Sequence, residues 1–444
     1  MSPRELALKI LYDVEKNGAY LNISFQNHTN EAGISERDAA LIKELTYGVV
    51  KYKLTLDAVI ARFSSVKLKK LAPFVLCILR MGVYQLYFMD KIPESAAVNE
   101  SVKLAGRYAG KSRGFVNAVL RRTTQEEFLL PEGTTPEALS VRYSHPLPLV
   151  LWLIETFGAE RAETLMAENN RAPSVCLRVN TLKTDSDAFI QRLEGEGVTV
   201  SKGKLTDCAV LLESGGVAKL ASYREGLFTI QDQSAQLAAL ALAPKPGERV
   251  YDVCAAPGGK TTHLAEMMEN RGEILALDFY GERLKAIEKT AERLGISIIR
   301  TREADASLYP FEAMADRILI DAPCSGLGVI RRRPDIKYKA ELTDFDELCD
   351  IQKKILDHCA GYLKPGGTMV YSTCTVNPAE NEGQIQEFLK NHRDFSLMAI
   401  DSPHILGRAK ETLAGGMGTF YPEREGGDGF FIAKLRRSGH DTEN

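Results

Sequence analysis

The stretch ERVYDVCAAPGGKTTHLAEMM (residues 248–268) decides the fold of the C-terminal half of the chain. An apolar strand pattern leads into a turn with two adjacent glycines, Gly258 and Gly259, and a helical pattern follows. Three further stretches also begin with an apolar strand, at 272–295, 315–326 and 366–375. Such alternation of strands and helices predicts a doubly wound, mostly parallel sheet that binds ligands at the carboxyl ends of its strands.

The sequence before this region predicts two other domains. Residues 1–140 show apolar residues at helical spacing, and Ser35 with Asp38 three residues later marks a helix start, so we expect a helical bundle. Turn-forming residues at the end of this region indicate a linker. Residues 141–232 contain two strand patterns around one helical pattern and predict a small α+β domain. Residues 233–438 then form the α/β core.

The composition is that of an ordinary globular protein. The chain has 444 residues, of which 44% are hydrophobic and 26% charged. Charges throughout the N-terminus argue against a signal peptide, and Arg80 interrupts the most apolar segment. The eight cysteines include no CxxC pair and the seven histidines no HxxxH spacing. We therefore expect a cytoplasmic protein with no disulfide framework, membrane span or bound metal. A monomer is our further expectation, which none of these patterns determines.

Charge is distributed unevenly along the chain. The net charge is −3, but residues 1–140 hold 19 Lys and Arg against 15 Asp and Glu, a balance of +4. The N-terminal part is therefore mildly basic and the rest of the chain is acidic. This distribution is compatible with RNA binding but is not by itself evidence for it.

The glycine turn and two carboxylates indicate a nucleoside cofactor. GGKT resembles the end of a phosphate-binding loop, but that motif needs a glycine where this chain has Cys254. Asp278 ends the next strand, at a position where a carboxylate can hold ribose hydroxyls, and Asp305 ends the third strand. Because no second GxG signal is present, S-adenosylmethionine is favoured over a dinucleotide.

The fourth and fifth strands end in cysteines, Cys324 and Cys374. In a sheet of this type the fourth strand borders the first and the fifth borders the fourth, so both thiols should face the cofactor crevice. Carbon 5 of a pyrimidine accepts a methyl group only after a thiolate has added to carbon 6. One cysteine would attack and a second group would assist release, while Asp321 and Lys260 could stabilise the developing charge. The spacing alone leaves open which cysteine attacks.

Four motifs together resemble the RNA cytosine-5 methyltransferases: DVCAAPGGKT (252–261), DAPCSGLGVIRRRPDIK (321–337), YSTCTVNPAEN (371–381) and DGFFIAKL (428–435). Segments 36–57, 78–105 and 114–122 resemble the NusB-like RNA-binding domain. The resemblance covers essentially the whole chain. It implies a multidomain fold with an all-α NusB-like bundle, a small α+β middle domain and a Rossmann-like, S-adenosylmethionine-dependent methyltransferase core.

The resemblance also implies an activity and site residues. The expected reaction is methylation of carbon 5 of one cytosine in 16S ribosomal RNA, cytosine 967, through a covalent cysteine adduct at carbon 6. Cys374 would be the nucleophile and Cys324 would assist product release, with Asp321 and Lys260 as further catalytic residues. The residues expected to bind S-adenosylmethionine are Cys254, Ala255, Ala256, Pro257, Gly258, Gly259, Lys260, Asp278, Asp305 and Asp321.

Basic residues are candidates for contact with RNA phosphates. Near the DAPC motif we favour phosphate contact over a solvated face for Arg331, Arg332, Arg333 and Lys337. Both interpretations stay open for the basic residues of the helical part, Arg107, Lys111, Arg113, Arg121 and Arg122. The competing functions are the same chemistry on transfer RNA, and a catalytically inactive RNA-binding assembly factor.

Overall fold

Amphipathic helices form the N-terminal part of the chain, as the apolar spacing predicts. The computed structural model describes residues 1–29, 33–126, 128–214, 216–217, 220–339 and 344–439. It divides the chain into a helical unit, residues 1–171 with 330–342, and a sheet unit, residues 172–329 with 343–444. The domain boundaries predicted at residues 140 and 232 stay predictions.

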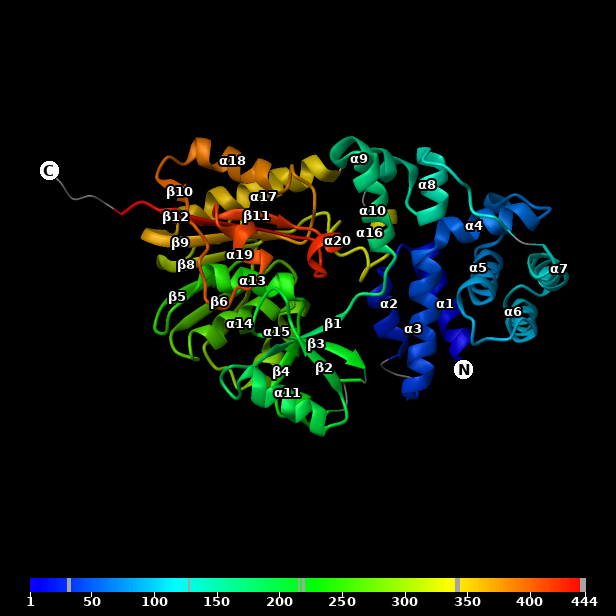
Figure 1. Cartoon of the computed structure of the whole chain (residues 1–444), viewed down its shortest axis with the longest axis horizontal. Coiled ribbons are helices and arrows are strands. Elements are labelled where there is room, and N and C mark those ends of the chain that lie inside the picture. Colours follow the sequence, from blue (N-terminus) through cyan, green and yellow to red (C-terminus); the bar gives the residue numbers. More distant parts are fainter. Residues whose placement is uncertain (30–32, 127, 215, 218–219, 340–343, 440–444) are drawn as a thin grey trace. The chain divides into compact units, whose positions relative to one another are not determined.

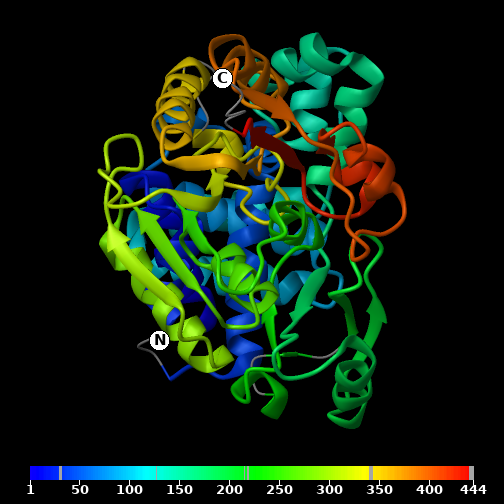
Figure 2. The same cartoon turned by 90° about the vertical axis from the view of Figure 1, so that its left-hand side faces the viewer.

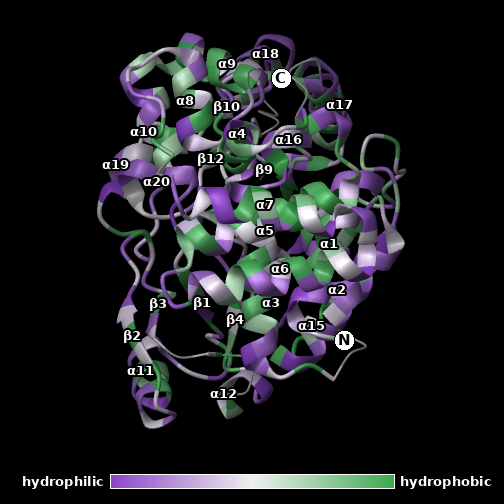
Figure 3. Ribbon diagram, turned by 90° about the vertical axis from the view of Figure 1, so that its right-hand side faces the viewer, coloured by the Kyte–Doolittle hydropathy of each residue, from purple (hydrophilic) through white to green (hydrophobic). Residues whose placement is uncertain are grey.

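The helical unit contains a buried apolar core to which helices throughout its first 123 residues contribute. The side chain of Ser35 caps α3 by accepting a hydrogen bond from the backbone N–H of Asp38 at 3.2 Å, as predicted. Figure 3 shows hydrophobic and hydrophilic residues alternating along these ribbons, the pattern of amphipathic helices. In the described part of the chain no helix is both long and apolar enough to cross a bilayer. The helices are α1 (Pro3–Asn17), α2 (Leu21–Thr29), α3 (Glu36–Lys51), α4 (Lys53–Phe63), α5 (Pro73–Phe88), α6 (Glu94–Tyr108), α7 (Arg113–Thr123), α8 (Pro136–Tyr143), α9 (Leu147–Phe157), α10 (Ala159–Asn169) and α16 (Ile336–Lys339), with 3-10 turns η1 (Leu68–Lys70) and η2 (Gly110–Ser112).

A short segment from the C-terminal half, residues 330–339, packs inside the helical unit. The carboxylate of Asp335 accepts a hydrogen bond from the backbone N–H of Leu21 at 3.2 Å, at the start of α2. The ammonium of Lys337 donates to the backbone carbonyl of Lys51, the last residue of α3, at 2.8 Å. These contacts satisfy polar groups at two helix ends, so the segment is a structural part of the unit.

The sheet unit begins with a small antiparallel sheet in the order β2-β3-β1-β4. Its two predicted strands and predicted helix are confirmed as β1, β3 and α11, while the short strands β2 and β4 were not predicted. Apolar residues of β1 and α11 pack in its core, which includes Leu177, Val179 and Phe189. The elements are β1 (Val175–Val179), α11 (Ser186–Gly195), β2 (Thr199–Lys202), β3 (Ala209–Ser214), α12 (Ala221–Arg224) and β4 (Phe228–Ile230).

The larger sheet has eight strands, in the order β10-β12-β9-β8-β5-β6-β7, with β11 paired to β12. Strands β5 to β9 are parallel, which confirms the predicted core and the predicted neighbours of the first, fourth and fifth strands. The antiparallel edge formed by β10, β11 and β12 was not predicted. The strands are β5 (Arg249–Asp252), β6 (Glu273–Asp278), β7 (Ile299–Glu303), β8 (Ala315–Asp321), β9 (Leu363–Thr373), β10 (Phe395–Leu397), β11 (Met417–Phe420) and β12 (Phe430–Arg437).

Helices cover both faces of this sheet (Figure 1). Leu319 of β8 and Val370 of β9 pack in the core that α13 and α14 cover. Their neighbours Ile320 and Tyr371 point to the opposite face, under α17 and α18, because successive strand residues alternate between faces. Figure 2 shows α17 and α18, in yellow and orange, side by side over the strands. The helices of this unit are α13 (Gln233–Leu242), α14 (Gly259–Met267), α15 (Gly281–Leu294), α17 (Asp344–Ala360), α18 (Glu382–Asn391), α19 (Arg408–Leu413) and α20 (Pro422–Glu425).

Candidate active site at the carboxyl edge of the sheet

The predicted cofactor loop connects β5 to α14 and is attached to the neighbouring strand β6. The backbone N–H of Ala255 donates to the carbonyl of Leu277 at 2.7 Å, and that of Ala256 donates to the carboxylate of Asp278 at 3.1 Å. Gly258 has φ +97°, and a Cβ there would lie 2.9 Å from Cγ1 of Ile287, so both conformation and space require glycine. Helix α14 starts at Gly259, and the free N–H groups of its first turn lie at the strand ends.

Two predicted carboxylates follow the next two strands. Asp278 is buried, and its Oδ1 accepts the backbone N–H of Tyr280 at 3.0 Å. Asp305 accepts the backbone N–H and the hydroxyl of Ser307 at 2.8 and 2.7 Å, both on Oδ1. Each carboxylate oxygen has two lone-pair sites, so both groups retain capacity to accept hydroxyl groups of a ligand. Phe279, directly after Asp278, is 63% exposed.

Asp252, at the end of β5, is a buried acid that the sequence did not single out. Its Oδ2 accepts the hydroxyl of Thr261 at 2.7 Å. Its Oδ1 is buried and has no hydrogen-bond partner among the described residues. Burial raises the pKa of Asp252 to about 7. A cationic group of a ligand would satisfy this oxygen and favour the ionised acid.

The predicted catalytic residues Lys260 and Asp321 form an ion pair. Nζ of Lys260 lies 2.6 Å from Oδ2 of Asp321, and the hydroxyl of Ser372 donates to Oδ1 at 2.9 Å. Burial alone would lower the pKa of Lys260, but the Asp321 carboxylate outweighs it and the pKa lies above its ordinary value. The ammonium also lies 4.9 Å from the centroid of the Phe430 ring. Lys260 is therefore a fixed positive charge at the strand ends.

The two predicted cysteines lie together. Asp321 of β8 pairs with Ser372 of β9 in parallel register, and the residues after these strands bring Sγ of Cys324 and Sγ of Cys374 to 3.4 Å. The contact with Cys374, together with burial, raises the pKa of the Cys324 thiol well above its ordinary value. Cys374 also contributes to the raised pKa of Lys260. Burial and the contact with Cys374 therefore favour the protonated thiol of Cys324, and Cys374 lies close enough to the Lys260 ammonium to interact with its charge.

Glu380, which the sequence reasoning did not single out, joins the two cysteine loops. Its carboxylate is fully buried and accepts from the backbone N–H of Ser325 at 2.8 Å and from Ser325 Oγ. It also accepts from the side-chain amides of Gln352 and Asn377, each at 3.0 Å. Ser325 follows Cys324, and Asn377 lies three residues after Cys374. The motif NPAEN, next to the predicted nucleophile, was the available signal.

The other cysteines have the character of core residues. Burial raises the pKa of Cys77, Cys208 and Cys359 to about 12. Cys254 of the cofactor loop packs against the core, and burial raises its pKa as well. Among the residues that the structure describes, no cluster of His, Cys, Asp and Glu side chains could hold a metal ion.

The predicted RNA-binding residues lie in the helical unit. Arg331 and Lys337 are buried, and their side chains contact protein atoms, the Glu168 carboxylate and the Lys51 carbonyl among them. Arg332 is half-buried and Arg333 is exposed. Contact of these residues with RNA phosphates stays a prediction. Arg333 is exposed and could make such a contact without leaving buried partners. The five basic residues of the helical part for which phosphate contact was left open are exposed: Arg107, Lys111, Arg113, Arg121 and Arg122.

Comparison with known proteins covers all three domains. Residues 239–436 match the family described as 16S rRNA methyltransferase RsmB/F, residues 1–125 match the NusB family, and residues 145–218 match the RsmF/B-like ferredoxin-like domain. The strand order and these matches define a methyltransferase core that follows a NusB domain and a ferredoxin-like domain. They confirm the predicted fold class.

Curated relatives match over the full length. A probable ribosomal RNA small subunit methyltransferase B of Bacillus subtilis is 38% identical over 99% of both chains. The ribosomal RNA small subunit methyltransferase B of Shewanella oneidensis is 34% identical over 99% of this chain and 100% of its own. Among solved structures, PH0851 covers 98% of this chain and 99% of its own at 27% identity, with a TM-score of 0.81. The chain belongs to the ribosomal RNA small subunit methyltransferase B family.

Proposed function

We propose that the protein transfers a methyl group from S-adenosylmethionine to carbon 5 of cytosine 967 in 16S ribosomal RNA, through a covalent adduct between Cys374 and carbon 6. One observation carries the proposal. The sulfur atoms of Cys374 and Cys324 lie 3.4 Å apart at adjacent strand ends, beside the Lys260–Asp321 ion pair. The family match supports the ribosomal substrate.

The loop and carboxylates have the chemistry to hold S-adenosylmethionine, which supplies a methyl group on a positively charged sulfur when bound. The unpartnered Oδ1 of Asp252 fits a cationic amino group, and the first-turn N–H groups of α14 fit a carboxylate. Asp278 and Asp305 can accept hydrogen bonds from ribose hydroxyls, and Phe279 offers a ring on which a purine base can stack.

The residues at the strand ends have separate tasks in this reaction. The thiolate of Cys374 forms a bond to carbon 6, which makes carbon 5 nucleophilic enough to accept the methyl group. Lys260 and Asp321 stabilise the charge that develops on the ring. A water molecule then takes the proton from carbon 5, and the electron pair of that C–H bond forms the double bond between carbons 5 and 6. The bond between carbon 6 and sulfur breaks at the same time, and its electron pair returns to Cys374. The Cys324 thiol can donate a hydrogen bond to that departing sulfur and thereby assist product release.

The helical unit offers exposed cations for the RNA backbone. Arg333, Arg113 and Arg121 are exposed and can contact phosphates. Arg107 would have to leave the buried carboxylate of Glu5, 2.7 Å away, and Arg122 the carbonyl of the buried Phe63, 3.2 Å away. Arg331 and Lys337 can contact phosphates only by leaving their buried partners. A cytoplasmic location and a monomeric state belong to the same proposal.

The test is incubation of the purified chain with methyl-labelled S-adenosylmethionine and either 16S ribosomal RNA or transfer RNA, followed by mapping of the labelled nucleotide. We expect label on a single 16S cytosine, recovered as 5-methylcytosine. Label on transfer RNA alone would assign the same chemistry to the other substrate. RNA binding without any label would identify an inactive assembly factor and overturn the proposal.

A further inference from the structure

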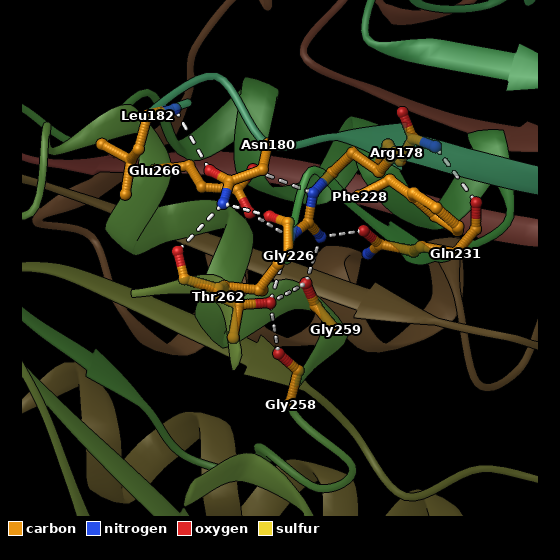
Figure 4. A network of polar contacts seen from close by, with 12 residues as sticks. Arg178, Asn180, Leu182, Gly226, Phe228, Gln231, Gly258, Gly259, Thr262 and Glu266 are labelled. Atoms are coloured by element: carbon orange, nitrogen blue, oxygen red, sulfur yellow. Dashed lines mark hydrogen bonds and ion pairs between the residues drawn. The ribbon is translucent and has the colours of Figure 1, made fainter. Parts of the chain in front are cut away.

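Arg178 of the small sheet reaches into the helix that follows the cofactor loop. It lies in β1, its side chain is fully buried, and its guanidinium contacts α14 (Figure 4). Nη2 lies 2.7 Å from Oε1 of Glu266 and donates to the hydroxyl of Thr262 at 3.0 Å. Nε donates to Oε2 of Glu266 at 3.1 Å. Nη1 donates to the backbone carbonyl of Gly259 and to the side-chain oxygen of Gln231.

These contacts join both ends of α14. Gly259 is the first residue of the helix and follows the glycine turn, while Glu266 lies in its last turn. Thr262, which accepts from Arg178, donates its own hydroxyl to the carbonyl of Gly258 at 2.9 Å. A side chain from outside the large sheet therefore contacts both ends of α14, including the first turn, which starts at the ends of the parallel strands.

The chemistry of the contact explains why arginine is present. A guanidinium has five N–H donors in a rigid planar fork, and here five contacts radiate from it to four residues. A buried ion pair on its own contributes little net stability compared with apolar packing. The benefit of this arrangement is geometric, since it fixes the carbonyl of Gly259 relative to Gln231 and Glu266.

We propose that Arg178 is a positioning residue that sets the affinity for S-adenosylmethionine through the first turn of α14. The inference rests on the proposed function, because it assumes that this turn holds the cofactor. Gln231 takes part in the same set of contacts around the first turn of α14, since its side-chain amide lies 3.6 Å from the position that a Cβ of Gly259 would occupy. The small domain thereby controls the cofactor site without touching the cofactor.

Asn180 provides a matched control. It lies just after β1, is fully buried, and donates to the carbonyls of Gly226 and Leu294 at 2.8 and 3.0 Å. Leu294 ends α15, so Asn180 attaches the small domain to a different helix. Asn180→Ala should weaken domain docking to a similar degree without releasing α14.

The experiment compares Arg178→Met, Arg178→Lys and Asn180→Ala in the full chain. Binding of S-adenosylmethionine is measured by calorimetry, and amide hydrogen exchange is followed at residues 259–263. We expect both Arg178 variants to weaken binding about tenfold or more. Exchange in the first turn of α14 should rise, while kcat at saturating cofactor should change little. Arg178→Lys keeps the positive charge beside Glu266 but loses the planar fork of N–H donors. Compared with Arg178→Met, it should therefore recover more of the melting temperature than of the affinity for S-adenosylmethionine. Asn180→Ala should leave binding within about twofold.

The outcomes separate the two proposals. Wild-type protein that does not bind S-adenosylmethionine would overturn the proposed function before any variant is examined. Unchanged affinity and unchanged exchange at residues 259–263 in folded Arg178→Lys would overturn the positioning role. An equal loss of affinity in Asn180→Ala would also overturn the positioning role, because it would show that any weakening of domain docking lowers the affinity.

Discussion

Removal of the Glu380 carboxylate should damage both the stability of the sheet unit and the alignment of the two cysteines. Its four hydrogen-bond donors come from the loop after β8, the loop after β9, and α17. In Glu380→Ala the backbone N–H of Ser325 and the amide of Asn377 lose their partners in a buried site. The amide of Gln352 keeps the carbonyl of Pro323 at 2.9 Å.

The magnitude follows from these partners. Each buried donor left without a partner costs about 1–3 kcal/mol, so the two unpartnered donors in Glu380→Ala should cost roughly 2–6 kcal/mol. Glu380→Gln keeps the shape and one acceptor. Its NH2 group can face Ser325 Oγ, which can turn its proton toward Thr375 Oγ1 at 2.7 Å, leaving the Asn377 donor unpartnered. We therefore expect a loss of about 1–3 kcal/mol for this variant.

Activity should fall more steeply than stability in Glu380→Gln. A misplacement of about 1 Å between reacting groups can cost about 100-fold in rate, and this carboxylate fixes Ser325, the residue next to Cys324. The assays are scanning calorimetry and the single-turnover rate of methyl transfer. Glu382→Gln is the matched control, because Glu382 lies only two residues further along, at the start of α18, and accepts only the Thr419 hydroxyl at 2.7 Å among its described contacts. Glu380→Ala with wild-type stability and rate would refute the reasoning.

Three further perturbations test the site and the fold. Cys374→Ala should abolish methylation, whereas Cys324→Ala should accumulate a covalent protein–RNA complex on denaturing gels; a complex formed by Cys374→Ala instead would reverse their roles. Burial raises the pKa of Asp252 from 3.8 to about 7, so the native protein binds more protons than the unfolded chain between these values. The free energy of unfolding of the ligand-free protein should therefore fall as pH rises through this window, by at most about 4 kcal/mol, and Asp252→Asn should flatten the slope. An equally steep slope in that variant would assign it to other groups. Asp335→Ala leaves the first N–H of α2 without its acceptor and should destabilise the helical unit by about 1 kcal/mol, read from the fluorescence of Trp152; an unchanged urea midpoint would show that the contact contributes nothing.

The sequence predicted those parts of the fold that have a strong local pattern. The parallel strands alternate with helices, and their ends carry the glycine turn, Asp278, Cys324 and Cys374, so strand order alone placed these residues together. The antiparallel strands β10 and β11 are short, and such strands gain their stability from partners far along the chain. No local pattern could therefore predict them.

Side-chain partners were harder to predict than backbone placement. A run of arginines and lysines is typical of a phosphate-binding surface, yet Lys337 is 1% exposed. Its ammonium donates hydrogen bonds to the backbone carbonyl of Lys51 and to the side-chain oxygen of Asn170. Arg178 and Glu380 were missed for the same reason. Their partners lie as far as 88 and 55 residues away in the sequence, and a single sequence does not show which distant residues come into contact in the fold.

Residues 330–339 also determine when the helical unit can finish folding during synthesis. Residues 172–329 separate this segment from the rest of its unit, so the ribosome translates them after residues 1–171 and before residues 330–339. At about 5–20 residues per second, that interval lasts roughly 8–30 s. Throughout it the start of α2 and the end of α3 lack the partners that Asp335 and Lys337 supply. The nascent N-terminal domain therefore stays incomplete on the ribosome until about half of the methyltransferase core, residues 239–436, has been made.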